Sequence, residues 1–225
     1  MKKMNLPNKL TILRIALVPM VIAAVLIEFP LHFLAAGLLF GAASITDMLD
    51  GRIARRDNLI TDFGKFADPL ADKILVISVM ICFVKLWLCG AIPLIIIIFR
   101  EFTVTSVRLV ASAKGKVIAA NMWGKVKTVS QIAAIVAIFV MQLAVEVISM
   151  VSVGHTVPLS LLTTVPLSLL TSGSALYEGA GYARVYGAFN IFNIIGQALM
   201  WFTAVITVIS GVKYLVDNKE VISDM

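Results

Sequence analysis

From Asp47 to Lys73 the chain reads DMLDGRIARRDNLITDFGKFADPLADK, and this segment holds six of the 13 acidic residues in a chain of 225. Apolar runs lie on either side of its centre, at 31–54 and 69–88. Residues three or four positions apart share a helix face. As helices, the two runs would pair Asp47 with Asp50 and Asp68 with Asp72. The short connection between them predicts antiparallel neighbours whose facing ends carry carboxylates.

The composition of the whole chain predicts a membrane protein. Apolar residues make up 60% and charged residues 14%, and the mean hydropathy is +0.99. Soluble domains have about 45–50% apolar and about 25% charged residues, so a soluble globular, disordered or fibrous chain is excluded. At about 20 residues per span, the apolar content suffices for about six helices.

Six apolar segments fit this number, and they lie at about 10–29, 31–54, 69–88, 91–113, 126–151 and 186–216. They are continuous rather than alternating, which favours helices over a barrel. The predicted fold is therefore all-α and integral to the membrane, as a single domain over residues 1–225. Residues 1–9 form an N-terminal arm. Residues 152–185 form a long outer loop that contains TVPLSLLT twice, at 156–163 and 164–171.

Basic residues indicate the orientation of these spans. Almost all of them lie in the N-terminal arm with Arg14, after the second and fourth spans, and in the tail. The positive-inside rule then places both termini in the cytoplasm, together with the facing ends of the second and third helices. The net charge of +6 is explained by this topology and by contact with an anionic lipid surface. It therefore does not indicate a nucleic acid partner, and none is expected.

The four paired aspartates have the chemistry of a metal site. Like charges this close cannot all stay ionised without a partner, and Mg²⁺ prefers carboxylate oxygens. Four carboxylates can hold two ions about 3.5–4 Å apart, as in two-metal phosphoryl transfer. Asp57 and Asp62 are instead interpreted as loop charges beside arginines. Cys82 and Cys89 lie in apolar sequence, which favours buried thiols over a disulfide.

The complete spacing is Asp47-x2-Asp50-Gly51-x2-Ala54-Arg55-x8-Gly64-x3-Asp68-x3-Asp72. It resembles the signature of the CDP-alcohol phosphatidyltransferase family at all eight of its fixed positions. The resemblance implies that a CDP-linked lipid donates its phosphatidyl group to an alcohol while CMP leaves. It also implies six helices over nearly the whole chain, a homodimer, and a multi-pass protein of the bacterial cytoplasmic membrane with its active site facing the cytoplasm.

The resemblance also assigns roles to single residues. Asp47, Asp50, Asp68 and Asp72 would bind Mg²⁺ or Mn²⁺, and Asp72 would also be the general base. Gly51, Ala54 and Gly64 would line the nucleotide pocket, with Arg55 on the phosphates of the nucleotide. Membrane lipids and CDP-diacylglycerol are the partners that this implies.

Three further segments suggest the acceptor. The opening Asn5–Arg14, the run Arg100-Glu101-Phe102 with Arg108, and Gly124–Thr128 resemble the family members that make phosphatidylglycerophosphate from sn-glycerol 3-phosphate. Arg100, Arg108, Lys125 and Lys127 would converge on the phosphate of the acceptor, because an arginine inside an apolar span is costly without an anion. Two structural alternatives stay open: Arg100 pairs with Glu101, and Lys125 and Lys127 only mark topology.

Three other functions share part of this pattern. The same chemistry with another acceptor, such as inositol phosphate, is the nearest alternative. A membrane prenyltransferase also uses aspartate-rich helices with Mg²⁺, but with different spacing and more spans. A transporter would place charges along a pathway, and the sequence has no repeated half with a matching broken helix.

Overall fold

The computed structural model describes residues 6–56, 62–113, 122–164 and 176–219, with side chains described for 11–46, 71, 73–112, 122–164 and 179–219. All regular structure in these ranges is helical, without a strand. The helices are α1 (Leu6–Leu26), α2 (His32–Arg56), α3 (Asp62–Lys85), α4 (Ala91–Ala113), α5 (Met122–Val153), α6 (Leu159–Thr164) and α8 (Leu176–Asp217). The prediction of an all-α fold is confirmed for the part of the chain that the structure describes.

Each of the six apolar segments lies in a long helix. Among the described residues, two helices are long and apolar enough to cross a bilayer by length and composition, at Met122–Val153 and Gly179–Asp217. Outward-facing side chains of α4 are also apolar: Ile95, Phe99 and Leu109 are 63%, 73% and 71% exposed. Such a surface is unfavourable in water and compatible with lipid. Six crossings and cytoplasmic termini remain predictions.

Two helices, α3 and α8, begin well before the expected spans. Helix α3 begins at Asp62 rather than near 69, because its first turns are polar and hydropathy marks only the apolar part of a helix. Helix α8 begins at Leu176, ten residues before the predicted start at 186, and α6 lies within the expected outer loop. An ideal Cβ on Gly181 would lie 2.4 Å from the carbonyl oxygen of Ser152, so a glycine permits α8 to pack closely on α5 there.

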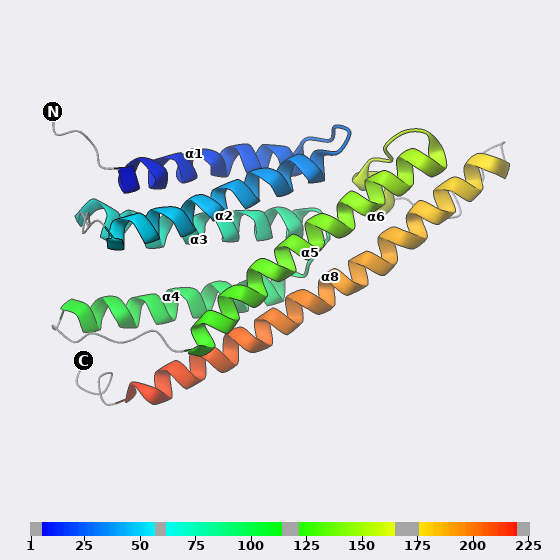
Figure 1. Cartoon of the computed structure of the whole chain (residues 1–225). Coiled ribbons are helices and arrows are strands. Elements are labelled where there is room, and N and C mark those ends of the chain that lie inside the picture. Colours follow the sequence, from blue (N-terminus) through cyan, green and yellow to red (C-terminus); the bar gives the residue numbers. More distant parts are fainter. Residues whose placement is uncertain (1–5, 57–61, 114–121, 165–175, 220–225) are drawn as a thin grey trace. The chain divides into compact units, whose positions relative to one another are not determined.

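The chain divides into two compact units. The first unit comprises Met1–Leu86 and Phe139–Asn190. Within it, α1 packs against both α2 and α3, and the three helices run side by side with alternating direction (Figure 1). The ring of Phe139 from α5 lies 5.8 Å from Phe40 and 5.2 Å from Phe83, measured between ring centroids. These aromatic contacts join α2, α3 and α5 in one core.

The second unit comprises Trp87–Ile138 and Ile191–Met225. Its core comes from α4, the first half of α5 and the second half of α8, with buried Ile97, Ile135 and Met200. Cys82 in the first unit and Cys89 in the second are both free and buried, which confirms the prediction of buried thiols rather than a disulfide. Cys89 lies between α3 and α4, and burial raises the pKa of its thiol to about 12.

Candidate active site

The aspartate signature spans the end of α2 and the beginning of α3. Asp47, Asp50, Gly51, Ala54 and Arg55 belong to the last turns of α2, and Gly64, Asp68 and Asp72 belong to the first turns of α3. Residues 57–61 join the two helices, which run in opposite directions (Figure 1). Both halves of the signature therefore lie at the same end of this helix group. The side chains of all eight residues lie outside the described part, as does Asp57.

The packing just before and within the signature is tight. Ala43 on α2 and Ala71 on α3 have no exposed surface, and Ala71 directly precedes Asp72. Ser44 donates a hydrogen bond to the carbonyl oxygen of Phe40 at 2.9 Å, and Thr46 donates to that of Ala43 at 2.7 Å. Hydroxyl groups in an apolar helix are satisfied by such bonds to the preceding turn. Both hydroxyl groups are thus satisfied within α2, just before Asp47.

Arg14 on α1 is a buried cation in the same unit. Its residue surface is 0% exposed, and that of Thr11, one turn earlier, is also 0%. From the sequence, Arg14 is one of the basic residues that mark the cytoplasmic side of the membrane. The structure adds that its side chain is buried. The sequence contains a signal for this polar face, because Thr11 and Arg14 are three positions apart on an otherwise apolar helix. The residues between and beside them are apolar: Ile12, Leu13 and Ile15.

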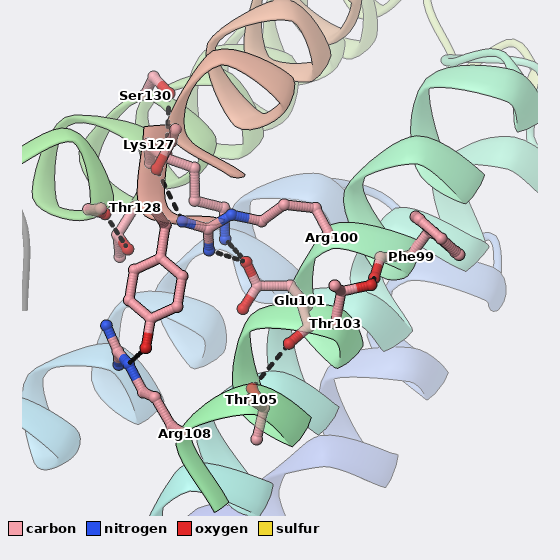
Figure 2. Close-up of polar contacts among 12 residues, drawn as sticks. Phe99, Arg100, Glu101, Thr103, Thr105, Arg108, Lys127, Thr128 and Ser130 are labelled. Carbon is pink, nitrogen blue, oxygen red and sulfur yellow. Dashed lines mark hydrogen bonds and ion pairs between the residues drawn. The ribbon is translucent and has the colours of Figure 1, made fainter. Parts of the chain in front are cut away.

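In the second unit, Glu101 forms ion pairs with two of the cations that were predicted to bind the acceptor (Figure 2). Arg100 Nη1 donates to Glu101 Oε1 at 3.1 Å, and Lys127 Nζ donates to the same oxygen. The three side chains are only 12%, 14% and 5% exposed for Arg100, Glu101 and Lys127. This is the pairing that the sequence left open for Arg100. One carboxylate and two cations leave the trio with a formal charge of +1.

The position of Arg100 is further set by α8. Arg100 Nη2 donates to Ser210 Oγ at 2.7 Å. An ideal Cβ on Gly211 would lie 2.9 Å from Arg100 Cγ, so this glycine leaves room for the stem of the arginine. The Nε of Arg100 is buried and makes no hydrogen bond within the described residues. A buried donor without a partner is costly, which makes this nitrogen a candidate contact for an anion.

Arg108 and Lys125 take other positions. The Arg108 side chain lies against Tyr214: Nε donates to the phenolic oxygen at 3.3 Å, and the guanidinium carbon is 5.3 Å from the ring centroid. Figure 2 shows this contact below the trio. Lys125 is exposed. The structure thus brings Arg100 and Lys127 together on one carboxylate, places Arg108 on an aromatic ring, and leaves Lys125 outside these contacts.

Three residues of α8 take part in these contacts without having been predicted: Ser210, Gly211 and Tyr214. A signal for two of them exists in the sequence, since Ser210 and Tyr214 are four positions apart and share one face of an apolar helix. Their partners on α4 are about 110 positions away, and local periodicity carries no information on such pairing.

Comparison with known proteins agrees with the signature. The family model described as CDP-alcohol phosphatidyltransferase matches residues 4–164. A Bacillus subtilis protein named CDP-diacylglycerol--glycerol-3-phosphate 3-phosphatidyltransferase is 46% identical over 157 residues, which is 64% of this chain and 81% of the relative. A protein of the same name from Rickettsia bellii is 34% identical over 210 residues, or 93% of each chain.

A plant relative carries a different name. The rice protein named cardiolipin synthase (CMP-forming) is 40% identical over 149 residues, which is 60% of this chain and 45% of the relative. The apolar helices and these relatives together indicate a membrane protein. With a family model that covers most of the chain and a relative that matches over 93% of it, the chain belongs to the CDP-alcohol phosphatidyltransferase family.

Proposed function

We propose that this protein transfers the phosphatidyl group of CDP-diacylglycerol to sn-glycerol 3-phosphate, giving phosphatidylglycerophosphate and CMP. The observation that carries the proposal is the eight-residue signature, which lies across one end of α2 and α3 in a member of this family. The shared name of the Bacillus subtilis and Rickettsia bellii relatives supports glycerol 3-phosphate as the acceptor.

The donor set fits a divalent metal. Asp47 and Asp50 are three positions apart on α2, and Asp68 and Asp72 are four apart on α3, so each pair shares a helix face. Carboxylate oxygens suit Mg²⁺ or Mn²⁺, and four carboxylates suffice for two ions. When bound, such ions would neutralise charge on the phosphoryl oxygens and on the departing CMP.

The chain's own residues would handle the proton and the nucleotide. A hydroxyl oxygen of the acceptor attacks the phosphorus that bears the diacylglycerol, and the bond from that phosphorus to the oxygen of CMP breaks. Asp72 would accept the proton of the hydroxyl as general base. Gly51, Ala54 and Gly64 lack bulk, so a nucleotide could approach the helix backbone there. Arg55 would pair with its phosphates.

The second unit would supply the acceptor site. Arg100 and Lys127 share Glu101 and retain a net positive charge, and Arg100 keeps one buried donor without a partner. These features suit the phosphate of glycerol 3-phosphate, which arginine binds well. Arg108 and Lys125 would add positive charge from the same cytoplasmic side. Neutral acceptors such as serine or inositol have no need of this cluster.

The proposed setting is a bacterial cytoplasmic membrane, crossed six times, with both termini and the active site facing the cytoplasm. The distribution of lysine and arginine supports this orientation. A site at the edge of the bilayer would let the acyl chains of the donor stay in lipid while its nucleotide meets water. We further propose that the protein is a homodimer, which the family resemblance implies.

A CMP-release assay with an acceptor panel tests the proposal. The purified full chain receives CDP-diacylglycerol, Mg²⁺ and one acceptor at a time: glycerol 3-phosphate, inositol phosphate, inositol, serine or phosphatidylglycerol. We expect CMP only with glycerol 3-phosphate, and loss of the activity when a chelator removes the metal. CMP release with inositol phosphate instead would identify that compound as the acceptor. CMP release that a chelator does not affect would contradict the role of the metal.

A further inference from the structure

The first unit contains a polar cavity that is remote from the aspartate signature. Its volume is about 190 Å³. It lies where α1 ends and α2 begins, beside the last turns of α5. His32 at its edge is 15 positions before Asp47 on α2, which corresponds to about 22 Å along a helix. The cavity is therefore separate from the proposed metal site. The polar side chains that line it are Glu28, His32, Gln142, Glu146 and Thr156.

His32 and Glu146 form a buried pair in this cavity. His32 Nε2 lies 3.1 Å from Glu146 Oε1, and both side chains are 8% exposed. The other ring nitrogen, Nδ1, lies 3.3 Å from the carbonyl oxygen of Ala24. Neither carboxylate oxygen of Glu146 accepts a hydrogen bond within the described residues. An imidazolium beside this carboxylate makes the contact an ion pair, and in that form the pair has no net charge.

The remaining polar groups are mainly acceptors. Glu28 is exposed at the rim, where Ser160 Oγ donates to its carboxylate at 3.4 Å. Gln142 is only 2% exposed, and its side-chain carbonyl oxygen has no hydrogen-bond partner among the described residues. None of the described residues that line the cavity is a lysine or an arginine. With the His32–Glu146 pair neutral, Glu28 gives the cavity a formal charge of −1.

The cavity thus has a buried carbonyl oxygen without a donor, carboxylates nearby and one unit of negative charge. A ligand that fits it would supply both N–H groups and one positive charge. We infer that this cavity binds a primary ammonium group. A primary ammonium has three donors, which would match Gln142, Glu146 and Glu28. A quaternary ammonium has the same charge and no donor, so it would leave Gln142 unsatisfied.

The rim of the cavity indicates where the ammonium group comes from. Phe29, Pro30 and Leu162 are among its apolar lining residues. Phe29 is 41% exposed, and Leu161, next to Leu162 in the chain, is 37% exposed. A polar end with an apolar rim on a membrane protein suits the head group of an aminophospholipid. A free small amine offers the same chemistry, and the response of the protein to free ethanolamine separates the two sources.

The test measures which lipid stays bound to the full-length protein. The protein is reconstituted in phosphatidylcholine bilayers with and without phosphatidylethanolamine, gently extracted, and examined by native mass spectrometry. We expect one retained phosphatidylethanolamine and no comparable retention of phosphatidylcholine, which lacks N–H donors. Equal retention of the two lipids would overturn the inference. The readout is independent of CMP release, so it does not depend on the proposed reaction.

Three variants locate the bound lipid. Gln142→Leu removes the unpartnered acceptor and should reduce retention about tenfold, the effect of losing one hydrogen bond to a charged group. Thr156→Phe fills the cavity from a half-buried position and keeps the inference testable if Gln142→Leu does not fold. Gln197→Leu, a matched control in the second unit, should retain the lipid. Normal retention by both cavity variants would refute the site.

Free ethanolamine separates the two sources. If the ammonium group alone suffices, ethanolamine should raise the unfolding temperature of the detergent-purified protein, and Gln142→Leu should abolish that shift. No shift together with retained phosphatidylethanolamine assigns the cavity to a lipid. Neither a shift nor selective retention rejects a primary ammonium as the ligand.

Discussion

Arg100 on α4 donates a hydrogen bond to the hydroxyl of Ser210 on α8 at 2.7 Å, although the two residues are 110 positions apart. The same guanidinium reaches Glu101 through its other terminal nitrogen. Two of the donors of Arg100 are therefore fixed by protein groups from two helices. These contacts hold the arginine in one orientation, and if Arg100 binds the acceptor phosphate as proposed, such preorganisation would lower the entropic cost of binding.

The first prediction concerns the shared carboxylate. Glu101→Gln leaves Arg100 and Lys127 without their common anion, and breaking a buried ion pair from one side costs about 3 kcal/mol. We expect a lower unfolding temperature. The variant Glu101→Gln/Lys127→Met removes the uncompensated cation as well, so its destabilisation should be smaller than the sum of the two single changes. Simple additivity would show that the pair contributes nothing to stability.

The second prediction concerns the space beside Arg100. Gly211→Ala adds a Cβ that would lie 2.9 Å from Arg100 Cγ, so the arginine must move. We expect a destabilisation of about 1–2 kcal/mol and a higher KM for glycerol 3-phosphate. Gly187→Ala on the same helix is the control, because a Cβ there meets nothing within 4 Å. That change should be neutral or stabilising by about 0.5–1 kcal/mol.

The third prediction concerns the proposed general base. Asp72→Asn keeps the shape of the side chain and removes its ability to accept a proton, so kcat should fall by about 10²–10⁴. Binding of the CDP-linked donor should persist. Asp57→Asn is the control within the same segment, since Asp57 is expected to be a loop charge. Turnover of Asp72→Asn at the rate of the unmodified protein would remove Asp72 from the reaction.

The fourth prediction separates two roles of Arg108. If Arg108 binds the acceptor, Arg108→Ala should raise the KM for glycerol 3-phosphate more than the KM for the donor. Tyr214→Phe keeps the ring beneath the guanidinium and removes only the hydroxyl that accepts the bond from Nε. Its effect on both KM values should be small. An equal rise of both KM values in Arg108→Ala would place this residue outside the acceptor site.

The sequence was informative about local elements. Continuous apolar runs predict membrane-length helices, and i, i+3 and i, i+4 spacing predicts shared faces; both need only neighbouring residues. The same method put the start of α8 at 186 rather than at Leu176. Residues 176–185 include two glycines and two charged residues, which lower the hydropathy, and the packing of Gly181 on Ser152 is not visible in the sequence.

Contacts between distant segments could not be predicted in this way. The bond from Arg100 to Ser210, the lysine that reaches Glu101 from α5, and the pair of His32 with Glu146 each join residues far apart in the chain. Charge alone suggested that Arg100 needs a partner, since an arginine in an apolar helix is costly. It could not say whether that partner is a substrate, a carboxylate or both.

The fit of Arg100 against Gly211 constrains the order in which these two positions can change during evolution. While the arginine is present, a side chain at 211 meets its stem at 2.9 Å. Once Arg100 is shortened to alanine, that obstacle is gone, and Gly211→Ala should become tolerated. The two substitutions are thus expected to show sign epistasis in the stability of the chain, with the loss of the glycine permitted only after the loss of the arginine.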